Sequence, residues 1–247
     1  MPEWIKISGG LTAITAGSRT NVWGVNSNGN IYRFSGNDAG DPSPWVPIPG
    51  SLSDIGAGAD GTVWGVNSGG NIYRYAGDQN IQGSSRWVQI RGSLTRIAAG
   101  SRTNVWGVNS NGNIYKFSGN DAGDPSAWVP IPGSLSDIGA GADGTVWGVN
   151  SGGNIYRYAG DQNIQGSSRW VHIRGNLTRI AVGSRTNVWG VNSNGNIYKF
   201  SGNDAGDPSP WVQIPGEAVD IGAASDGTVW HVNSAGDIYR YAGDQPG

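Results

Sequence analysis

Short apolar segments alternate with glycine-rich turns along the whole chain. Four segments at the start of the chain have the length and the β-branched or aromatic side chains of β-strands: residues 11–16, 22–26, 30–34 and 45–48. Ser-Asn-Gly or Ser-Gly-Gly joins the second segment to the third, which predicts a tight hairpin. The second and third segments are apolar on both faces, as expected for a sheet with neighbours on both sides. Pro47 and Pro49 fit an outer edge strand, where a missing N–H donor is tolerated.

This four-segment unit recurs six times. One tryptophan series lies in a VWxVN motif, at Trp23, Trp64, Trp106, Trp147, Trp189 and Trp230. A second series opens a W-[IV]-x-I motif, at Trp4, Trp45, Trp87, Trp128, Trp170 and Trp211. Both series are spaced by 41 or 42 residues, and repeats of this length with several short strands each are typical of a β-propeller. No linker interrupts the series, so residues 1–247 are predicted to form a single six-bladed, all-β domain with four antiparallel strands per blade.

The repeats alternate between two types, so the chain reads as three pairs of 83 residues. Residues 18–92 and 101–175 differ only at Arg33/Lys116, Pro44/Ala127 and Gln89/His172. The last repeat stops before its W-x-x-I strand, and the chain begins with that motif at residues 4–7. We therefore expect residues 4–7 to complete blade six and close the ring, which leaves no open sheet edge.

Composition excludes several classes of protein. The chain has 43 glycines but only five leucines, two glutamates and three lysines, so it lacks the residues that would build a helical protein. Only 14% of residues are charged and the net charge is −2, which argues against binding to nucleic acid or to an anionic membrane. No apolar run is long enough to span a membrane, so no membrane insertion is expected. The absence of cysteine and of a signal peptide predicts a cytoplasmic protein, which could still act outside the cell after release.

The topology predicts where a ligand would bind. In an up-and-down blade, the first-to-second and third-to-fourth loops share one face of the disc, and these are the long loops. At that end of blade one the sequence places Arg19, Asn21, Asp38, Asp41 and aromatic residues. Indole rings stack on the C–H faces of sugars, and planar polar groups bind their hydroxyls. The candidate carbohydrate-binding residues are Trp23, Arg33, Trp45, Trp64, Arg74, Tyr75, Trp87, Trp106, Lys116, Trp128, Trp147, Arg157, Tyr158, Trp170, Trp189, Lys199 and Trp211.

The same residues can be interpreted as purely structural. Packing between blades accounts for the Trp23 series better than ligand contact does, whereas the Trp45 series fits either role. The cations at Arg33 and equivalent positions can pair with carboxylates or lie in solvent. The Asn-Asp-Ala-Gly-Asp loops lack the spaced oxygen donors of a calcium site, so no metal and no cofactor are expected.

The repeat resembles a known family. W-x-x-I-x-G-x-L-x-x-I-x-x-G followed by VWGVNxxGxIYR is similar to the tectonin repeat over the whole chain, and most similar to the tectonin 2 lectins of mushrooms. That resemblance implies a six-bladed propeller that binds glycans, with O-methylated fucose or mannose of bacteria or nematodes as the ligand in innate defence. Assembly into a homo-oligomer would add further valency.

Repeat six departs from the pattern. His231 replaces the glycine of VWGVN, Ala235-Gly236-Asp237 replaces Gly-Gly-Asn, and the chain ends where the third-to-fourth loop would continue. We expect the binding site that involves blade six to be altered or lost.

Two other functions compete with glycan binding. An enzyme would need a singular site, but Glu3 and Glu217 are the only glutamates, His172 and His231 the only histidines, and nearly every aspartate recurs. The sequence therefore predicts a protein that is not an enzyme. A non-catalytic scaffold for protein–protein interaction is the alternative, because propellers often serve that role.

Overall fold

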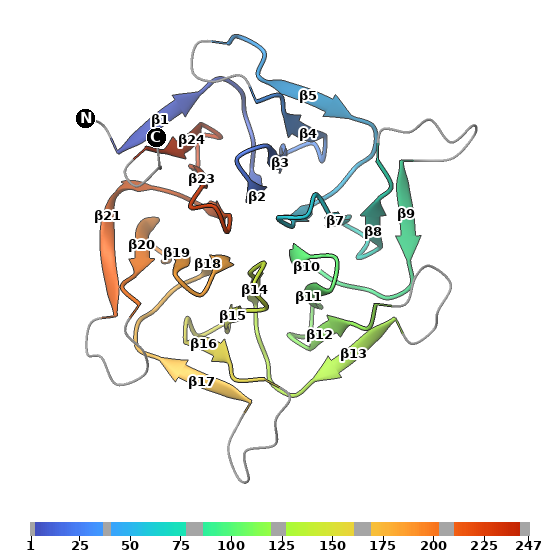
Figure 1. Ribbon diagram of the computed structural model, residues 1–247, viewed down its shortest axis with the longest axis vertical. Coiled ribbons are helices and arrows are strands. Elements are labelled where there is room, and N and C mark those ends of the chain that lie inside the picture. The colour runs from blue at the N-terminus through green and yellow to red at the C-terminus, as the bar shows by residue number, and fades with distance from the viewer. Residues whose placement is uncertain are drawn as a thin grey trace.

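The computed structural model describes residues 3–36, 41–77, 86–119, 127–160, 169–202 and 210–242. These residues form six four-stranded antiparallel sheets, which surround a central axis like the blades of a propeller (Figure 1). The predicted all-β, six-bladed fold is therefore confirmed. The first strand of each blade lies next to the axis, and the fourth runs along the outer rim (Figure 1).

The first three blades follow the chain directly. Blade 1 contains β2 (Ala13–Ser18), β3 (Asn21–Val25), β4 (Ile31–Phe34) and β5 (Trp45–Ile48). Blade 2 contains β6 (Asp54–Ala57), β7 (Val63–Val66), β8 (Ile72–Tyr75) and β9 (Trp87–Ile90). Blade 3 contains β10 (Arg96–Ser101), β11 (Asn104–Val108), β12 (Ile114–Phe117) and β13 (Trp128–Ile131).

The remaining blades repeat this order, except that the last one combines both ends of the chain. Blade 4 contains β14 (Asp137–Ala140), β15 (Val146–Val149), β16 (Ile155–Tyr158) and β17 (Trp170–Ile173). Blade 5 contains β18 (Arg179–Ser184), β19 (Asn187–Val191), β20 (Asn196–Phe200) and β21 (Trp211–Glu217). Blade 6 contains β22 (Asp220–Ala223), β23 (Val229–Val232), β24 (Ile238–Tyr241) and β1 (Trp4–Ile7).

The N-terminal strand closes the ring as expected. Trp4 pairs with Tyr241, and Ile7 pairs with Ile238, in antiparallel register. Three strands of blade 1 differ in their bounds from the prediction. The second is shifted by one residue to Asn21–Val25, and the third begins at Ile31. The first begins at Ala13 and runs to Ser18. A bulge lets Ser18 pair with Asn21 and extends the strand past the predicted end.

The core consists of apolar layers between blades. The buried residues of blade 1 that face blade 2 include Trp23, Val25 and Ile31, and they pack with Leu52 and Ile55. Near the axis the backbones approach so closely that a Cβ on Gly17 would overlap the carbonyl oxygen of Gly58 in the next blade. Small residues at the axis are therefore a packing requirement.

Candidate functional site

The inner tryptophan series is buried in the inter-blade core. The rings of Trp23, Trp64, Trp106, Trp147, Trp189 and Trp230 are 0–1% exposed. Each ring packs edge-on against the third-strand aromatic residue of the next blade, as Trp23 does against Tyr75 with ring centroids 4.9 Å apart. Their surface is almost wholly covered by neighbouring blades, which favours packing for Trp23, Trp64, Trp106, Trp147 and Trp189. Trp23, Trp64 and Trp106 still line clefts at the loop face, so a contact of these rings with a ligand stays a prediction. Burial of large aromatic surface explains their position.

The outer tryptophan series links neighbouring blades at the rim. The outer strands follow one another around the disc (Figure 1). Each of them begins with a tryptophan. The indole N–H of Trp45 donates to the Ser8 carbonyl at 2.9 Å, and that of Trp87 donates to the Pro49 carbonyl at 2.9 Å. The same bond joins Trp128 to Arg91, Trp170 to Pro132, Trp211 to Arg174 and Trp4 to Pro215.

These bonds give the outer series a structural role, but burial differs along it. Trp87 and Trp170 in the even blades are only 7–8% exposed, whereas Trp45, Trp128 and Trp211 in the odd blades are half-buried. The three odd-blade rings and Trp4 of blade 6 therefore present a face to solvent. Beside Trp211, a pocket of about 310 Å³ extends to Tyr198 and Arg174.

Two different polar contacts join the blades at the loop face, which we define as the end of the disc that carries the first-to-second and third-to-fourth loops. From odd to even blades, the Asn21 side chain donates to the Gly58 carbonyl and accepts the indole N–H of Trp23 at 2.7 Å. From even to odd blades, the Asp60 carboxylate accepts the backbone N–H of Arg102 at 2.9 Å. This alternation explains why the repeats come in two types.

The even blades carry threonine where the odd blades have this asparagine. As a result, the buried indole N–H groups of Trp64, Trp147 and Trp230 have no hydrogen-bond partner among the described residues. The hydrogen-bonding of Asn21 also corrects our expectation that it is available to a ligand, because both ends of its amide are already bonded.

Candidate residues from two blades meet at the loop face between blades 1 and 2 and between blades 3 and 4. A cleft of about 880 Å³ is lined by Arg33 and Val46 of blade 1 and by Thr62, Tyr75 and Gly77 of blade 2, and it continues to blade 3. A second cleft of about 580 Å³ lies between blades 3 and 4. Its lining includes Lys116, Thr145, Arg157, Tyr158 and Gly160. We call these the odd–even clefts.

A cation covers the inner tryptophan in each odd blade. The Arg33 guanidinium lies 5.8 Å from the ring centroid of Trp23. Lys116 and Lys199 lie 5.7 and 5.6 Å from the corresponding rings of Trp106 and Trp189. At these distances the ring attracts the cation, which fixes its charge at the wall of the cleft.

Three exposed valines lie beside these cations. Val46, Val129 and Val212 are 39%, 46% and 53% exposed. They pair across the sheet with Arg33, Lys116 and Lys199 respectively. Our sequence reasoning missed these valines, although the V in each odd W-V-x-I motif was the available signal. In the cleft between blades 1 and 2, whose lining includes Val46, the valine next to the cation gives both an apolar and a polar wall.

The third-strand aromatics distinguish the two types of interface. Tyr75 and Tyr158 of the even blades are half-buried in the odd–even clefts, whereas Phe34, Phe117 and Phe200 take this position in the odd blades. Arg74 and Arg157 line the same clefts from the even blades. The odd–even interface therefore carries an additional hydroxyl.

Part of the predicted site lies outside the described residues. Asp38 and most of the long third-to-fourth loops fall in this group, so the structure neither supports nor opposes their role. Asp41 accepts the backbone N–H of Ser43 at 2.8 Å, which makes it a local turn residue. Within the described ranges, no group of three or more His, Cys, Asp or Glu side chains is placed to hold a metal ion, and no helix there could cross a membrane.

Blade 6 differs in the way its sequence suggests. His231 is 2% exposed, and its ring stacks on Tyr239 and contacts Trp4 edge-on. Burial lowers the pKa of His231 to about 4, so the ring is neutral at physiological pH. Tyr241, the blade-six counterpart of Tyr75, is only 6% exposed. The effect of these differences on binding stays a prediction.

Comparison with solved structures supports the architecture. The chain is similar to YCF48 bound to a D1 peptide (16% identity, TM-score 0.58, covering 99% of this chain and 98% of that one). It is also similar to a streptogramin B lyase (14% identity, TM-score 0.59, 97% of both chains). A third similar structure is the β-propeller domain of Cps50 (Swd1) from Myceliophteria thermophila (9% identity, TM-score 0.63, 98% and 100%). At these identities, the likeness concerns the fold alone.

The sequence comparisons identify the family. A search of curated proteins gave no significant match. The family model described as "Tectonin domain" matches residues 1–127 and again residues 120–246, which together span nearly the whole chain. The two matches together include strands of all six blades, and the chain therefore belongs to the tectonin family.

Proposed function

We propose that the protein is a multivalent lectin whose saccharide sites are the odd–even clefts of the loop face. The observation that carries this proposal is the combination of a fixed cation, an exposed valine and a half-buried tyrosine in the cleft between blades 1 and 2. The cleft between blades 3 and 4 repeats the cation and the tyrosine. A sugar offers hydroxyls to the polar groups and C–H surface to the apolar ones. The clefts are also large enough for a mono- or disaccharide.

We further propose that the ligands are O-methylated sugars, such as methylated fucose or mannose on bacterial or nematode glycans. An ether methyl replaces a hydroxyl donor with an apolar group, which suits the cleft whose lining includes the exposed side chain of Val46. Burial of one methyl contributes about 0.8 kcal/mol, or roughly fourfold in affinity at a single site. Simultaneous occupation of several clefts multiplies this small preference, as a defence lectin requires.

The recurrence of a similar aromatic cleft at two odd–even interfaces favours binding over catalysis, since an active site is normally singular. The likeness to a lyase concerns only the fold, so it does not change this proposal. The likeness to a propeller bound to a peptide keeps a protein-interaction scaffold as the alternative.

A glycan array tests the proposal directly. It should carry mono-O-methylated fucose and mannose beside the unmethylated parents. We expect binding to the methylated members to exceed binding to their parents. Titration calorimetry with a monovalent methyl glycoside then gives the number of sites, expected to be two or three per chain depending on blade 6. Absence of binding to any glycan, together with capture of a peptide ligand, would replace the lectin with the scaffold.

A further inference from the structure

Six equivalent side chains face the central axis at one level of the propeller. Each is the first-strand residue that pairs with the last valine of the second strand, as Asp54 pairs with Val66 and Arg96 with Val108. In order around the axis these residues are Ala13, Asp54, Arg96, Asp137, Arg179 and Asp220. We call them the axial ring. Its positions lie about 42 residues apart in sequence, so only the closed fold brings them together.

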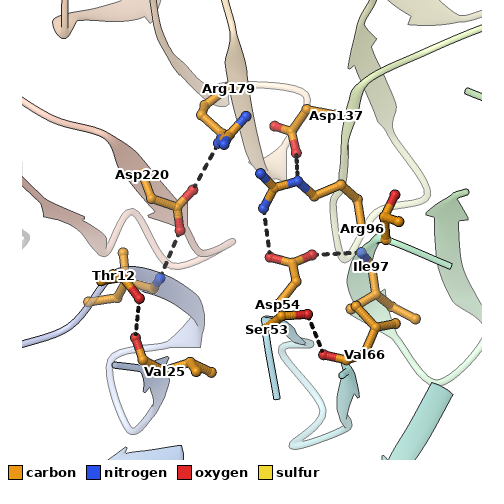
Figure 2. A network of polar contacts seen from close by, with 12 residues as sticks. Thr12, Val25, Ser53, Asp54, Val66, Arg96, Ile97, Asp137, Arg179 and Asp220 are labelled. Carbon is orange, nitrogen blue, oxygen red and sulfur yellow. Dashed lines mark hydrogen bonds and ion pairs between the residues drawn. The ribbon is translucent and has the colours of Figure 1, made fainter. Parts of the chain in front are cut away.

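The charges of the axial ring alternate and form two groups of ion pairs, Asp54–Arg96–Asp137 and Arg179–Asp220 (Figure 2). Arg96 lies between two carboxylates, 3.3 Å from Asp54 and 3.7 Å from Asp137. Arg179 lies 3.8 Å from Asp220. Each aspartate also accepts a backbone N–H from the following blade, as Asp220 does from Ile14 at 2.8 Å (Figure 2). The ring is thus held by charge and by hydrogen bonds.

The alternation is broken at Ala13. The threefold pattern would place an arginine there, but blade 1 has a methyl group. The ring therefore holds three carboxylates and two guanidinium groups. Asp220 and Asp54, which flank the gap, each have an arginine on one side only. A narrow cavity of about 60 Å³ runs along the axis past the three aspartates, so little water reaches them.

The environment of these carboxylates disfavours a third negative charge. Burial raises the pKa of Asp54 and of Asp137, although the nearby arginines oppose this effect. Burial, followed by the charge of Asp54, raises the pKa of Asp220 to about 7. The backbone bond from Ile14 and the two arginines compensate only partly.

We propose that the axial ring is a proton-binding site: one proton, held by the Asp54 and Asp220 pair on either side of Ala13, takes the place of the missing sixth cation. With this proton bound the axial ring is electrically neutral, because two ionised carboxylates then face two guanidinium groups. The stability of the closed propeller is thereby linked to pH in the mildly acidic to neutral range.

No other titratable group on the packed elements accounts for this proton. β2, β3 and β7, which pack on β6 or β22, carry no acidic or basic side chain, and neither does β19. The charged groups that face the pair are Arg96 from β10 and Arg179 from β18. Asp137 from β14 interacts with Asp54. His231 on β23 packs instead against Trp4 and Tyr239.

The direction of the pH effect follows from the raised pKa. Asp220 binds a proton more tightly in the folded chain than in the unfolded chain. The contribution of Asp220 to the free energy of unfolding is fully present below the pKa of this carboxyl in the unfolded chain, near 4. It is lost as the pH rises toward the folded pKa of about 7. An arginine at position 13 would remove this dependence, because both flanking carboxylates could then ionise beside a cation.

The test compares Ala13→Arg with Ala13→Gln, a matched variant of similar shape without charge. Unfolding is followed by urea titration from pH 5 to pH 8. The quantity compared is the ratio of two folding equilibrium constants, that of Ala13→Arg divided by that of Ala13→Gln. We expect this ratio to rise by up to about tenfold per pH unit between pH 5 and pH 7. A ratio that does not change with pH would overturn the proposal. Because other titrating groups are common to both variants, they cancel in this ratio.

A second measurement does not depend on stability. Carboxyl carbon NMR of the wild-type chain should show one aspartate that titrates near pH 7, and Asp220→Asn should remove it. In Ala13→Arg the same resonance should titrate at least one pH unit lower. If every aspartate of the wild-type chain titrates below pH 5, the ring carries no proton at neutral pH and the proposal fails.

Discussion

Ala218 and His231 occupy two positions of blade 6 that change together. In each of the other five blades, the position of Ala218 holds a leucine and that of His231 a glycine. There, a Cβ on the glycine would overlap the Cδ1 of the leucine, as it would for Gly24 and Leu11. A side chain can therefore replace the glycine only where the leucine is shortened, and blade 6 has both changes. The imidazole fills space that a leucine occupies elsewhere.

This relationship predicts compensation between two substitutions. Ala218→Leu alone should overpack the blade, and His231→Gly alone should leave a cavity. Each should lower the free energy of unfolding by about 1–3 kcal/mol. The double variant restores the arrangement of the other blades and should lie close to wild type. A double-mutant cycle by chemical denaturation measures the coupling, and simple additivity of the two losses would contradict the account.

Acid should destabilise the wild-type chain through His231. Its folded pKa of about 4 lies below the ordinary value of 6.5. The stability that depends on the neutral ring is therefore present above pH 6.5 and is lost as pH falls toward 4. Between pH 7 and pH 4.5 the wild type should lose up to about 2–3 kcal/mol relative to the Ala218→Leu/His231→Gly variant. Parallel stability curves for the two proteins would show that the imidazole titrates normally.

Trp4 should be critical for ring closure. Its indole donates to the Pro215 carbonyl, and its ring contacts Tyr241 and Trp189. Trp4→Ala should lower the free energy of unfolding by about 2–4 kcal/mol, since the ring is only partly exposed. Removal of residues 1–7 should expose the edge of β24 and produce association that light scattering detects.

Lys6→Ala is the matched control on the same strand. It removes the exposed ion pair with Asp237, so the melting temperature should hardly change. If Trp4→Ala were as well tolerated as Lys6→Ala, the N-terminal strand would not be what holds the ring closed.

The asparagine contacts should contribute to stability in the odd blades. Asn104 accepts the indole N–H of Trp106 and donates to the Gly141 carbonyl. Asn104→Thr introduces the residue of the even blades and leaves buried polar groups unpaired, for a loss of about 1–3 kcal/mol. Thermal and urea unfolding measure it. Asn111→Thr in the exposed hairpin is the control, and an equal effect of both changes would argue against a specific contact.

The exposed valines should determine selectivity for the methyl group. Val46→Thr, Val129→Thr and Val212→Thr combined keep the shape of each side chain and replace one methyl by a hydroxyl. We expect the preference for methylated over unmethylated sugar to fall by about fourfold per site, with the fold unchanged. Val219→Thr is the control, because this valine is equally exposed at the opposite end of the blade, near the axial ring. Equal selectivity in all these proteins would place the methyl group elsewhere.

The candidate site could be predicted only in part. The sequence places Arg33 and Tyr75 in separate repeats, and their meeting in one cleft depends on how blades stack. Only the structure established the burial of the Trp23 series, because alternation along a strand does not show which face meets a neighbouring blade. The indole bonds of the Trp45 series join residues about 38 positions apart, which no local pattern reveals.

The sequence by itself determined the number of blades, the four strands in each and the closure by residues 4–7. These features depend on periodicity and on turn residues, which are local properties of the chain. Only the tertiary structure decided that Asp54, Arg96 and Asp220 meet at the axis and that Ala13 leaves their charges unbalanced. The physical reason is that electrostatic energy depends on distance and burial, and both are set by the closed ring.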